Sequence, residues 1–127
     1  MIEEAKRLAK KLADELDYVG VLALELFMTK DGKLLANEFA PRVHNSGHWT
    51  QDACFTGQFE QHIRAVCGWP LGDPTRHSDG EMLHLPGEDA NAWEQHLTEG
   101  AKLHLYGKRR AISGRKMGHI TKLKPRG

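Results

Sequence analysis

The sequence predicts an α+β fold of antiparallel strands with packed helices, and three observations support that class. Residues 2–16 carry apolar side chains at helical spacing. Residues 18–28 and 33–40 are two β-prone runs joined by an Asp-Gly pair, which is typical of a tight hairpin. Beyond the Gly72-Asp73-Pro74 boundary only short helical and extended segments follow. We therefore expect helices and antiparallel strands in the same chain.

Length and composition set broad limits on the function. The 127 residues allow one full domain, or one domain with a small appendage. A net charge of +1 argues against a general electrostatic nucleic-acid binder, and no apolar run is long enough to cross a membrane. Met1 opens a charged segment rather than a signal peptide, and Cys54 and Cys67 lack Cys-x-x-Cys spacing. These features favour free thiols and a reducing, cytoplasmic location.

The boundary near residue 73 divides the chain into two expected parts. In residues 1–73, the helix at 2–16 precedes the hairpin, and Thr56 is a plausible N-cap for a second helix that ends at Gly68-Trp69-Pro70. That second helix carries apolar residues at helical spacing, namely Phe59, Ile63, Val66 and Cys67.

The second expected part, residues 74–127, is small and β-rich. Its elements are a strand near 81–85, a helix near 89–98, and strands near 102–106 and 116–123. Elements this short bury little apolar surface alone, so they should pack on the first part or on another chain.

The hairpin places two acidic residues face to face. If Asp31-Gly32 is a two-residue turn, Lys30 faces Lys33, and counting outward along both strands puts Glu25 opposite Glu38. Like charges at facing positions destabilise a sheet unless a cation lies between them or one carboxyl stays protonated. Magnesium with nucleotide phosphates is the usual cation for such a site. The alternative is a slipped register or a bulge that separates the acids.

The strand exit after Glu38 is dense in polar groups. Its sequence, residues 37–50, is Asn-Glu-Phe-Ala-Pro-Arg-Val-His-Asn-Ser-Gly-His-Trp-Thr. Packing alone does not explain this inventory, which is typical of a site for metal, phosphate or carboxylate. Zinc held by His44, His48 and Cys54 is a weaker interpretation, because their spacing matches no common structural zinc site.

A second cluster of charge lies near the C-terminus. Two strands and the Ala-Ile-Ser-Gly turn between them carry five cations, namely Lys108, Arg109, Arg110, Arg115 and Lys116. Such a hairpin tip can bind a phosphate, because Arg offers a bidentate fork and Lys a point charge. An ordinary exposed basic hairpin is the alternative.

These motifs resemble 5-(carboxyamino)imidazole ribonucleotide synthetase, the ATPase subunit of phosphoribosylaminoimidazole carboxylase. The resemblance rests on the segment 37–50, on Gln-Phe-Glu-Gln-His-Ile-Arg-Ala at 58–65, and on Tyr106-x-Lys108 and Gly-Arg-Lys-x-Gly-His at 114–119. It covers essentially the whole chain but only the last third or so of the family's length. It implies a C-terminal half of an ATP-grasp domain followed by a small C-terminal β-rich domain.

The resemblance also implies an activity. It is that of a ligase of purine biosynthesis, in which ATP and bicarbonate give carboxyphosphate, which then carboxylates aminoimidazole ribonucleotide. The implied cofactors are ATP and magnesium, the implied metal ligands are Glu25 and Glu38, and Asn37 and Glu38 would lie at the nucleotide. Ala40 stands where many ATP-grasp enzymes carry a further metal-binding asparagine.

The remaining site residues are also implied by the family. Arg42 follows the second glutamate by four residues, as the anion-binding arginine does in related biotin carboxylases. It would bind bicarbonate or carboxyphosphate. The rest of that implied pocket is His44, Asn45, Ser46 and His48. The residues implied to bind the ribonucleotide phosphate are Lys108, Arg115 and Lys116.

The sequence contains no glycine-rich loop of the kind that covers ATP, so we expect an inactive C-terminal portion that needs the N-terminal portion of the enzyme. Family members are commonly dimers, which implies a homodimer. Two alternatives stay open: formate-dependent glycinamide ribonucleotide transformylase, and a non-catalytic binding or assembly module. The transformylase typically has His-Asp-Thr-Gly where this chain has His-Asn-Ser-Gly at 44–47, so the loop favours the synthetase.

Overall fold

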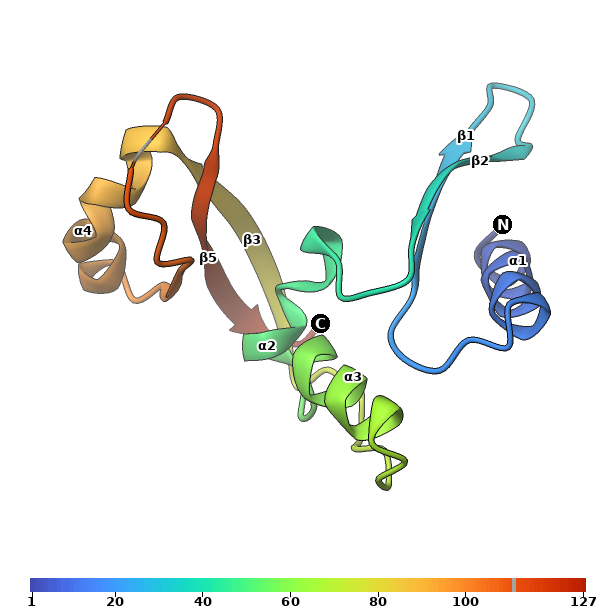
Figure 1. The fold of residues 1–127 in the computed structure, drawn as a ribbon. Helices are drawn as coiled ribbons and strands as arrows, with labels where there is room; N and C mark the ends of the chain where they lie inside the picture. Colours follow the sequence, from blue (N-terminus) through green and yellow to red (C-terminus); the bar gives the residue numbers. More distant parts are fainter. Residues whose placement is uncertain (111) are drawn as a thin grey trace. The chain divides into compact units, whose positions relative to one another are not determined.

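The computed structural model describes residues 1–110 and 112–127, which form two compact units. The first unit contains residues 1–47 and 58–72, and the second contains residues 48–57 and 73–127. Figure 1 shows the order of the elements along the chain. Their bounds are α1 Ile2–Glu15, β1 Ala23–Met28, β2 Leu34–Ala40, η1 Asn45–Gly47, α2 Thr50–Ala53, α3 Gln58–Val66, β3 Ser78–Pro86, η2 Gly87–Ala92, α4 Trp93–Thr98, β4 Lys102–Leu105 and β5 Lys116–Pro125.

The predicted α+β class is confirmed, because both sheets are antiparallel and helices accompany them. The division of the chain into domains at residue 73 stays a prediction. Several element boundaries differ from the sequence-based expectation, and β3 begins three residues earlier than expected. Residues 18–22 precede β1 rather than joining it, α3 begins two residues after Thr56, and the helix expected near 89–98 is split into η2 and α4.

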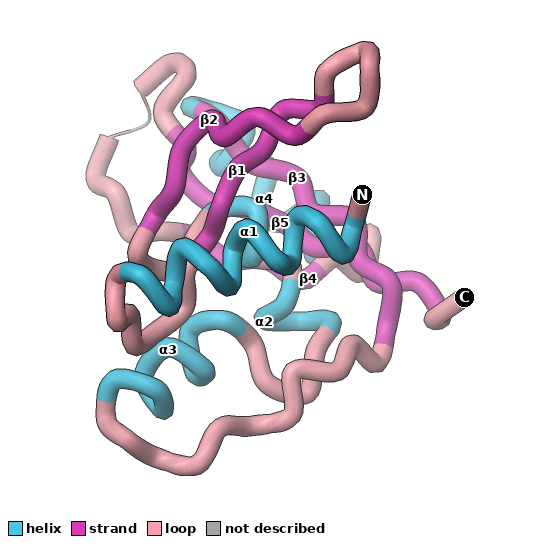
Figure 2. Tube along the Cα trace, turned by 90° about the vertical axis from the view of Figure 1, so that its right-hand side faces the viewer, coloured by secondary structure: helices cyan, strands magenta, loops and turns pink. Residues whose placement is uncertain are grey.

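In the first unit, helix α1 packs along the β1–β2 hairpin. Leu8 and Leu12 of the helix line the same hollow as Leu24 and Leu26 of β1, and Figure 2 shows the helix running alongside these strands. The helix has an apolar stripe facing the strands and a polar face bearing the ion pairs Lys6–Glu3, Arg7–Glu4 and Lys10–Asp14. Leu8 and Leu12 are half-buried there, and no residue of α1 is fully buried.

The turn of the hairpin differs from the predicted two-residue turn. The Thr29 amide donates to the Lys33 carbonyl and the Gly32 amide to the Thr29 carbonyl, so the loop has three residues, with Gly32 at φ +81°. Lys30 therefore does not face Lys33, and Met28 pairs with Leu34. A glycine at positive φ is what such a three-residue hairpin loop requires.

The predicted pairing of Glu25 with Glu38 is nevertheless confirmed. Leu26 pairs with Ala36, whereas Glu25 pairs with Glu38, so Asn37 is an extra residue on β2. This β-bulge offsets the extra residue of the turn and restores the expected register. The pairing was right for an incomplete reason: two departures from the ideal hairpin cancel.

The second unit is built on a three-stranded sheet of order β3-β5-β4. One face of the sheet forms the apolar core, in which Leu85 and Ile120 pack with Ala101, and Ala90 and Leu103 lie at its margin. Strands β3 and β4 pair with either side of β5, and the central strand is the most buried. The close approach of β4 depends on Gly118, because a Cβ there would lie 2.5 Å from the His104 carbonyl oxygen.

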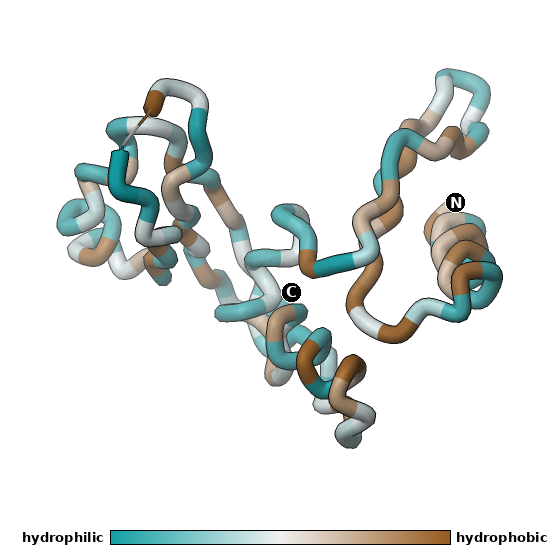
Figure 3. The backbone as a smooth tube through the Cα atoms, in the orientation of Figure 1, coloured by the Kyte–Doolittle hydropathy of each residue, from teal (hydrophilic) through white to brown (hydrophobic). Residues whose placement is uncertain are grey.

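Several apolar side chains stay exposed in the described chain. On α3 these are Phe59, Ile63 and Val66, the residues that the sequence placed on its apolar face. Figure 3 shows apolar stretches along this helix. Among the described residues, no helix has the length and apolar character needed to cross a bilayer.

Candidate functional site

The glutamate pair owes its geometry to the bulge in β2. A bulge inserts one residue and turns the neighbouring side chains of the strand, so that Asn37 and Glu38 both lie near Glu25. The Asn37 Nδ2 donates a hydrogen bond to Glu25 Oε2 at 3.2 Å. In a regular strand, successive side chains would point to opposite faces of the hairpin. The bulge therefore brings an amide to the same place as two carboxylates.

His44 completes this group. Its Nε2 lies 3.4 Å from Glu25 Oε1 and 3.9 Å from Glu38 Oε1. One ligand atom from each of the three residues falls within 4.8 Å of the others. The Glu25 and Glu38 side chains are 40% and 62% exposed, so a ligand can reach them, whereas the His44 side chain is 11% exposed.

The backbone of His44 is held by a side chain from α3. Gln58 Oε1 accepts from the His44 amide at 3.0 Å, and Gln58 Nε2 donates to the His44 carbonyl at 2.8 Å. Gly47 leaves room for this amide, because a Cβ there would lie 2.5 Å from Gln58 Oε1. Ser46 Oγ lies 2.9 Å from His44 Nδ1 and fixes the other ring nitrogen. The loop is thus built to hold one imidazole beside the carboxylates.

Gln58 was missed as a site residue from the sequence. It belongs to the quoted 58–65 motif, but its spacing from His44 gives no sign that the two are joined. Only the fold brings the first residue of α3 to the loop after β2.

The other predicted residues of the loop differ in exposure: Arg42 is exposed, Asn45 is half-buried and His48 is buried. Arg42 is exposed and donates through Nη1 to the Val43 carbonyl at 2.9 Å, and Asn45 opens the short helix η1. His48 belongs to the second unit, where its ring stacks on that of His119 with centroids 4.9 Å apart. The structure thus gathers Glu25, Asn37, Glu38 and His44, and places His48 in a separate group.

The two carboxylates fit a hard cation. Carboxylate oxygens are the protein ligands that Mg²⁺ prefers, and it is commonly held by one or two of them together with substrate phosphates. The unfavourable juxtaposition of two like charges is relieved when a cation lies between them.

The basic residues predicted to bind phosphate lie near the start of β5. Lys108 Nζ donates to the Lys116 carbonyl at 2.6 Å and lies 5.6 Å from the centroid of the Tyr106 ring. Arg115 and Lys116 are exposed. The turn predicted between the two strands includes residue 111, which lies outside the described residues. The three residues predicted to bind the ribonucleotide phosphate, Lys108, Arg115 and Lys116, thus come from one end of the sheet.

Two family profiles match consecutive parts of the chain. Residues 1–59 match the ATP-grasp domain, and residues 71–126 match the phosphoribosylaminoimidazole carboxylase C-terminal domain. The glutamate pair and the loop through Thr50 lie in the first match, and the basic cluster lies in the second.

Curated relatives agree with these matches over nearly the whole chain. N5-carboxyaminoimidazole ribonucleotide synthase of Brucella melitensis is 62% identical over 125 residues, which is 98% of this chain and 34% of the relative. The enzyme of the same name from Bacillus subtilis is 56% identical over 124 residues, which is 96% of this chain and 33% of the relative. The chain therefore spans about a third of the length of these relatives.

Solved structures show the same relationship. A crystal structure of an ADP complex of N5-carboxyaminoimidazole ribonucleotide synthetase superposes with a TM-score of 0.88 and 49% identity, over 96% of this chain and 33% of that one. The structure of the Aspergillus clavatus enzyme with ADP and aminoimidazole ribonucleotide superposes with a TM-score of 0.89 and 36% identity. The match covers 98% of this chain and 35% of that one. The resemblance seen in the sequence is confirmed: the chain belongs to the N5-carboxyaminoimidazole ribonucleotide synthase family.

Proposed function

We propose that this chain forms part of an ATP- and bicarbonate-dependent ligase that carboxylates aminoimidazole ribonucleotide by way of carboxyphosphate. The observation that carries the proposal is the paired Glu25 and Glu38, with His44 held beside them, in a chain 62% identical to a named synthase. The chain would contribute the metal-binding strands of the ATP-grasp domain and the C-terminal domain of a longer enzyme.

Glu25 and Glu38 would hold Mg²⁺, which neutralises charge on the nucleotide phosphates when it is bound. Asn37 holds Glu25 in place through its 3.2 Å hydrogen bond and would lie beside the phosphates. Solved structures of relatives contain ADP in one case and ATP in another, which supports nucleotide binding by the complete enzyme.

Arg42 would bind bicarbonate and stabilise the negative charge that develops on carboxyphosphate. Arg42 is exposed, follows Glu38 by four residues and donates to the Val43 carbonyl. His44 would orient the anion from the glutamate side. Asn45 and Ser46 would complete this pocket, whereas the role predicted for His48, which belongs to the second unit, stays a prediction.

Lys108, Arg115 and Lys116 would bind the phosphate of the ribonucleotide. Lys108 is positioned by its bond to the Lys116 carbonyl and by the Tyr106 ring, and the exposed Arg115 can offer two donors to one phosphate. The complex of a relative with aminoimidazole ribonucleotide supports a ribonucleotide ligand. We also propose a homodimer as the assembled form.

A hybrid enzyme tests this function. Residues of this chain replace the matching third of the Bacillus subtilis relative, and ADP release is measured with ATP, bicarbonate and aminoimidazole ribonucleotide. The hybrid should turn over only when all three substrates are present. Lys108→Ala should raise KM for the ribonucleotide, whereas Lys102→Ala, on an exposed part of β4, should not.

A folded hybrid with no ribonucleotide-dependent ADP release would instead support the non-catalytic module. Activity that requires formate and glycinamide ribonucleotide would support the transformylase alternative.

A further inference from the structure

Three histidines form a row across the sheet of the second unit. His84 on β3 pairs with His119 on β5, which pairs with His104 on β4. Directly facing residues of neighbouring strands point to the same side of a sheet. The row therefore lies on the face opposite Leu85 and Ile120, whose positions alternate with it.

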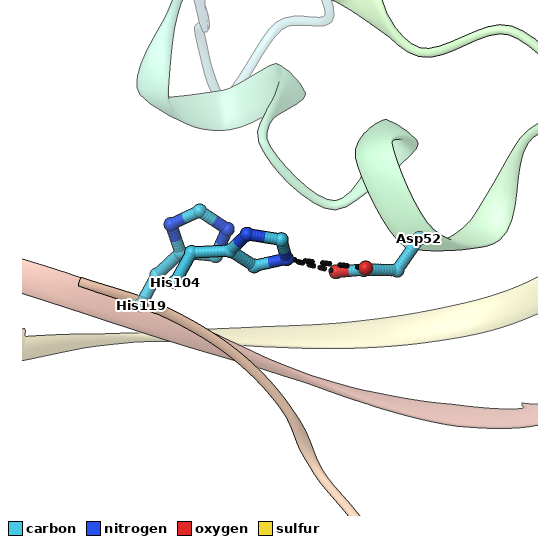
Figure 4. A group of neighbouring side chains, drawn as sticks. All are labelled: Asp52, His104 and His119. Atoms are coloured by element: carbon cyan, nitrogen blue, oxygen red, sulfur yellow. Dashed lines mark hydrogen bonds and ion pairs between the residues drawn. The ribbon is translucent and has the colours of Figure 1, made fainter. Parts of the chain in front are cut away.

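Helix α2 and His48, which lies two residues before the helix begins, cover this row. His48 stacks on His119 with 4.9 Å between ring centroids and 25° between planes. Asp52 lies at the other side, with its two carboxylate oxygens 2.9 and 3.1 Å from His104 Nε2. Figure 4 shows Asp52 reaching His104 from α2, with the His119 ring beside that of His104. Their ring centroids are 4.6 Å apart.

The central histidine carries an unpaired buried nitrogen. His119 is 1% exposed, and its Nδ1 lies 2.9 Å from the Tyr106 hydroxyl, whereas its Nε2 is buried with no hydrogen-bond partner. A buried polar atom without a partner costs free energy. If Nδ1 donates its proton to the Tyr106 oxygen, Nε2 presents a lone pair. This is the arrangement that a hydroxyl or carboxylate partner gives to a metal-binding imidazole.

We propose that Asp52, His104 and His119 bind one divalent transition-metal ion of the zinc type. One ligand atom from each lies within 4.8 Å of the other two. Two imidazoles and a carboxylate favour zinc over magnesium, and three protein ligands with a water in the fourth position is a common zinc set.

The surroundings suit this ligand set. The His104 side chain is 25% exposed, so the ligand set borders solvent at this residue. This site is separate from the glutamate pair, which belongs to the first unit.

Zinc titration against a fluorescent chelator tests the proposal on the full chain. All proteins carry Cys67→Ser, because that thiol is exposed and would compete for zinc. The parent should bind one ion per chain at this site. Asp52→Asn and His104→Asn should each weaken that binding, and Tyr106→Phe, which removes the partner of Nδ1, should weaken it by about 10- to 100-fold.

Two controls separate this site from others. His77→Asn changes an exposed histidine on the same unit and should leave zinc affinity unchanged, and Glu38→Gln should also leave it unchanged. Asp52→Asn keeps the side-chain shape, and circular dichroism checks that each variant is folded. Absence of zinc binding by the parent, equal affinity in Asp52→Asn and His104→Asn, or loss of binding in Glu38→Gln would each overturn the proposal.

Discussion

At the scale of single residues, the site depends on groups that never touch a substrate in the proposed reaction. Gln58 is 8% exposed, and the oxygen and the nitrogen of its side-chain amide both form hydrogen bonds with the backbone of His44. The sequence could indicate that His44 belongs to a working loop, because the loop is crowded with polar groups. It could not indicate Gln58, because a bond between residues fourteen positions apart depends on how α3 folds back.

Replacing Gln58 with alanine should destabilise the first unit. The change leaves the buried His44 amide without the Gln58 acceptor, which costs about 1–3 kcal/mol, whereas the His44 carbonyl keeps the hydrogen bond donated by the Gly47 amide. The free energy of unfolding, measured in urea, should fall accordingly. Gln51→Ala changes an exposed glutamine and is the matched control. Equal stability of the two variants would show that Gln58 does not support the loop.

The buried histidine row should make the second unit sensitive to acid. Burial lowers the pKa of His119 to about 4 from an ordinary 6.5, and burial also lowers the pKa of His84. The unfolded chain therefore binds protons more readily than the folded one below pH 6.5. The groups facing His119 are His48, Asp52, His84, His104 and Tyr106.

Stability should accordingly be full above about pH 6.5, fall as the pH drops towards about 4, and level off below that value for this group. A pKa shift of this size corresponds to a loss of roughly 3 kcal/mol in the free energy of unfolding once His119 is protonated. Urea unfolding at a series of pH values measures the slope. In His119→Gln the slope over this interval should be smaller, and an unchanged slope would contradict the assignment.

At the scale of elements, the β1–β2 hairpin shows what sequence patterns can and cannot give. The Asp-Gly pair and two β-prone runs correctly predicted a hairpin with Glu25 opposite Glu38. The three-residue loop and the bulge at Asn37 were not predictable from the alternation, because each shifts the register by one residue and the two shifts cancel. Asn37 reaches Glu25 only because of that bulge.

The hairpin loop gives a prediction about Gly32. Its φ of +81° disfavours a residue with a Cβ, although a Cβ there would meet no atom within 4 Å. Gly32→Ala should therefore destabilise the hairpin by about 1–2 kcal/mol through backbone strain alone. Gly32→Asn should cost less, because asparagine tolerates this conformation better. Thermal unfolding of both variants checks the order, and a larger loss in Gly32→Asn would argue against it.

At the scale of the whole molecule, the chain spans about a third of its curated relatives. The loop motif at 37–50 and the tail motif identified the family from sequence, and the comparisons confirm it. The histidine row could not be found this way. His84, His104 and His119 are far apart in sequence, and only the strand order β3-β5-β4 aligns them.

The 127-residue chain by itself should not carboxylate aminoimidazole ribonucleotide. Its sequence holds the proposed metal-binding strands but no glycine-rich loop to cover the phosphates of ATP. In assays of ADP release, the chain alone should give the same rate as a control that contains buffer and no protein. Turnover that depends on ATP, bicarbonate and the ribonucleotide, and that is lost in Glu38→Gln, would refute this expectation.

The most direct measurement is a calorimetric titration of magnesium-ADP into the hybrid enzyme. The account predicts that the parent binds, that Glu38→Gln loses most of the affinity, and that Asp31→Asn, an exposed acid at the tip of the same hairpin, binds as the parent does. Magnesium-ADP binding that is equal in Glu38→Gln and in the parent would contradict the claim that the glutamate pair holds the metal-nucleotide complex.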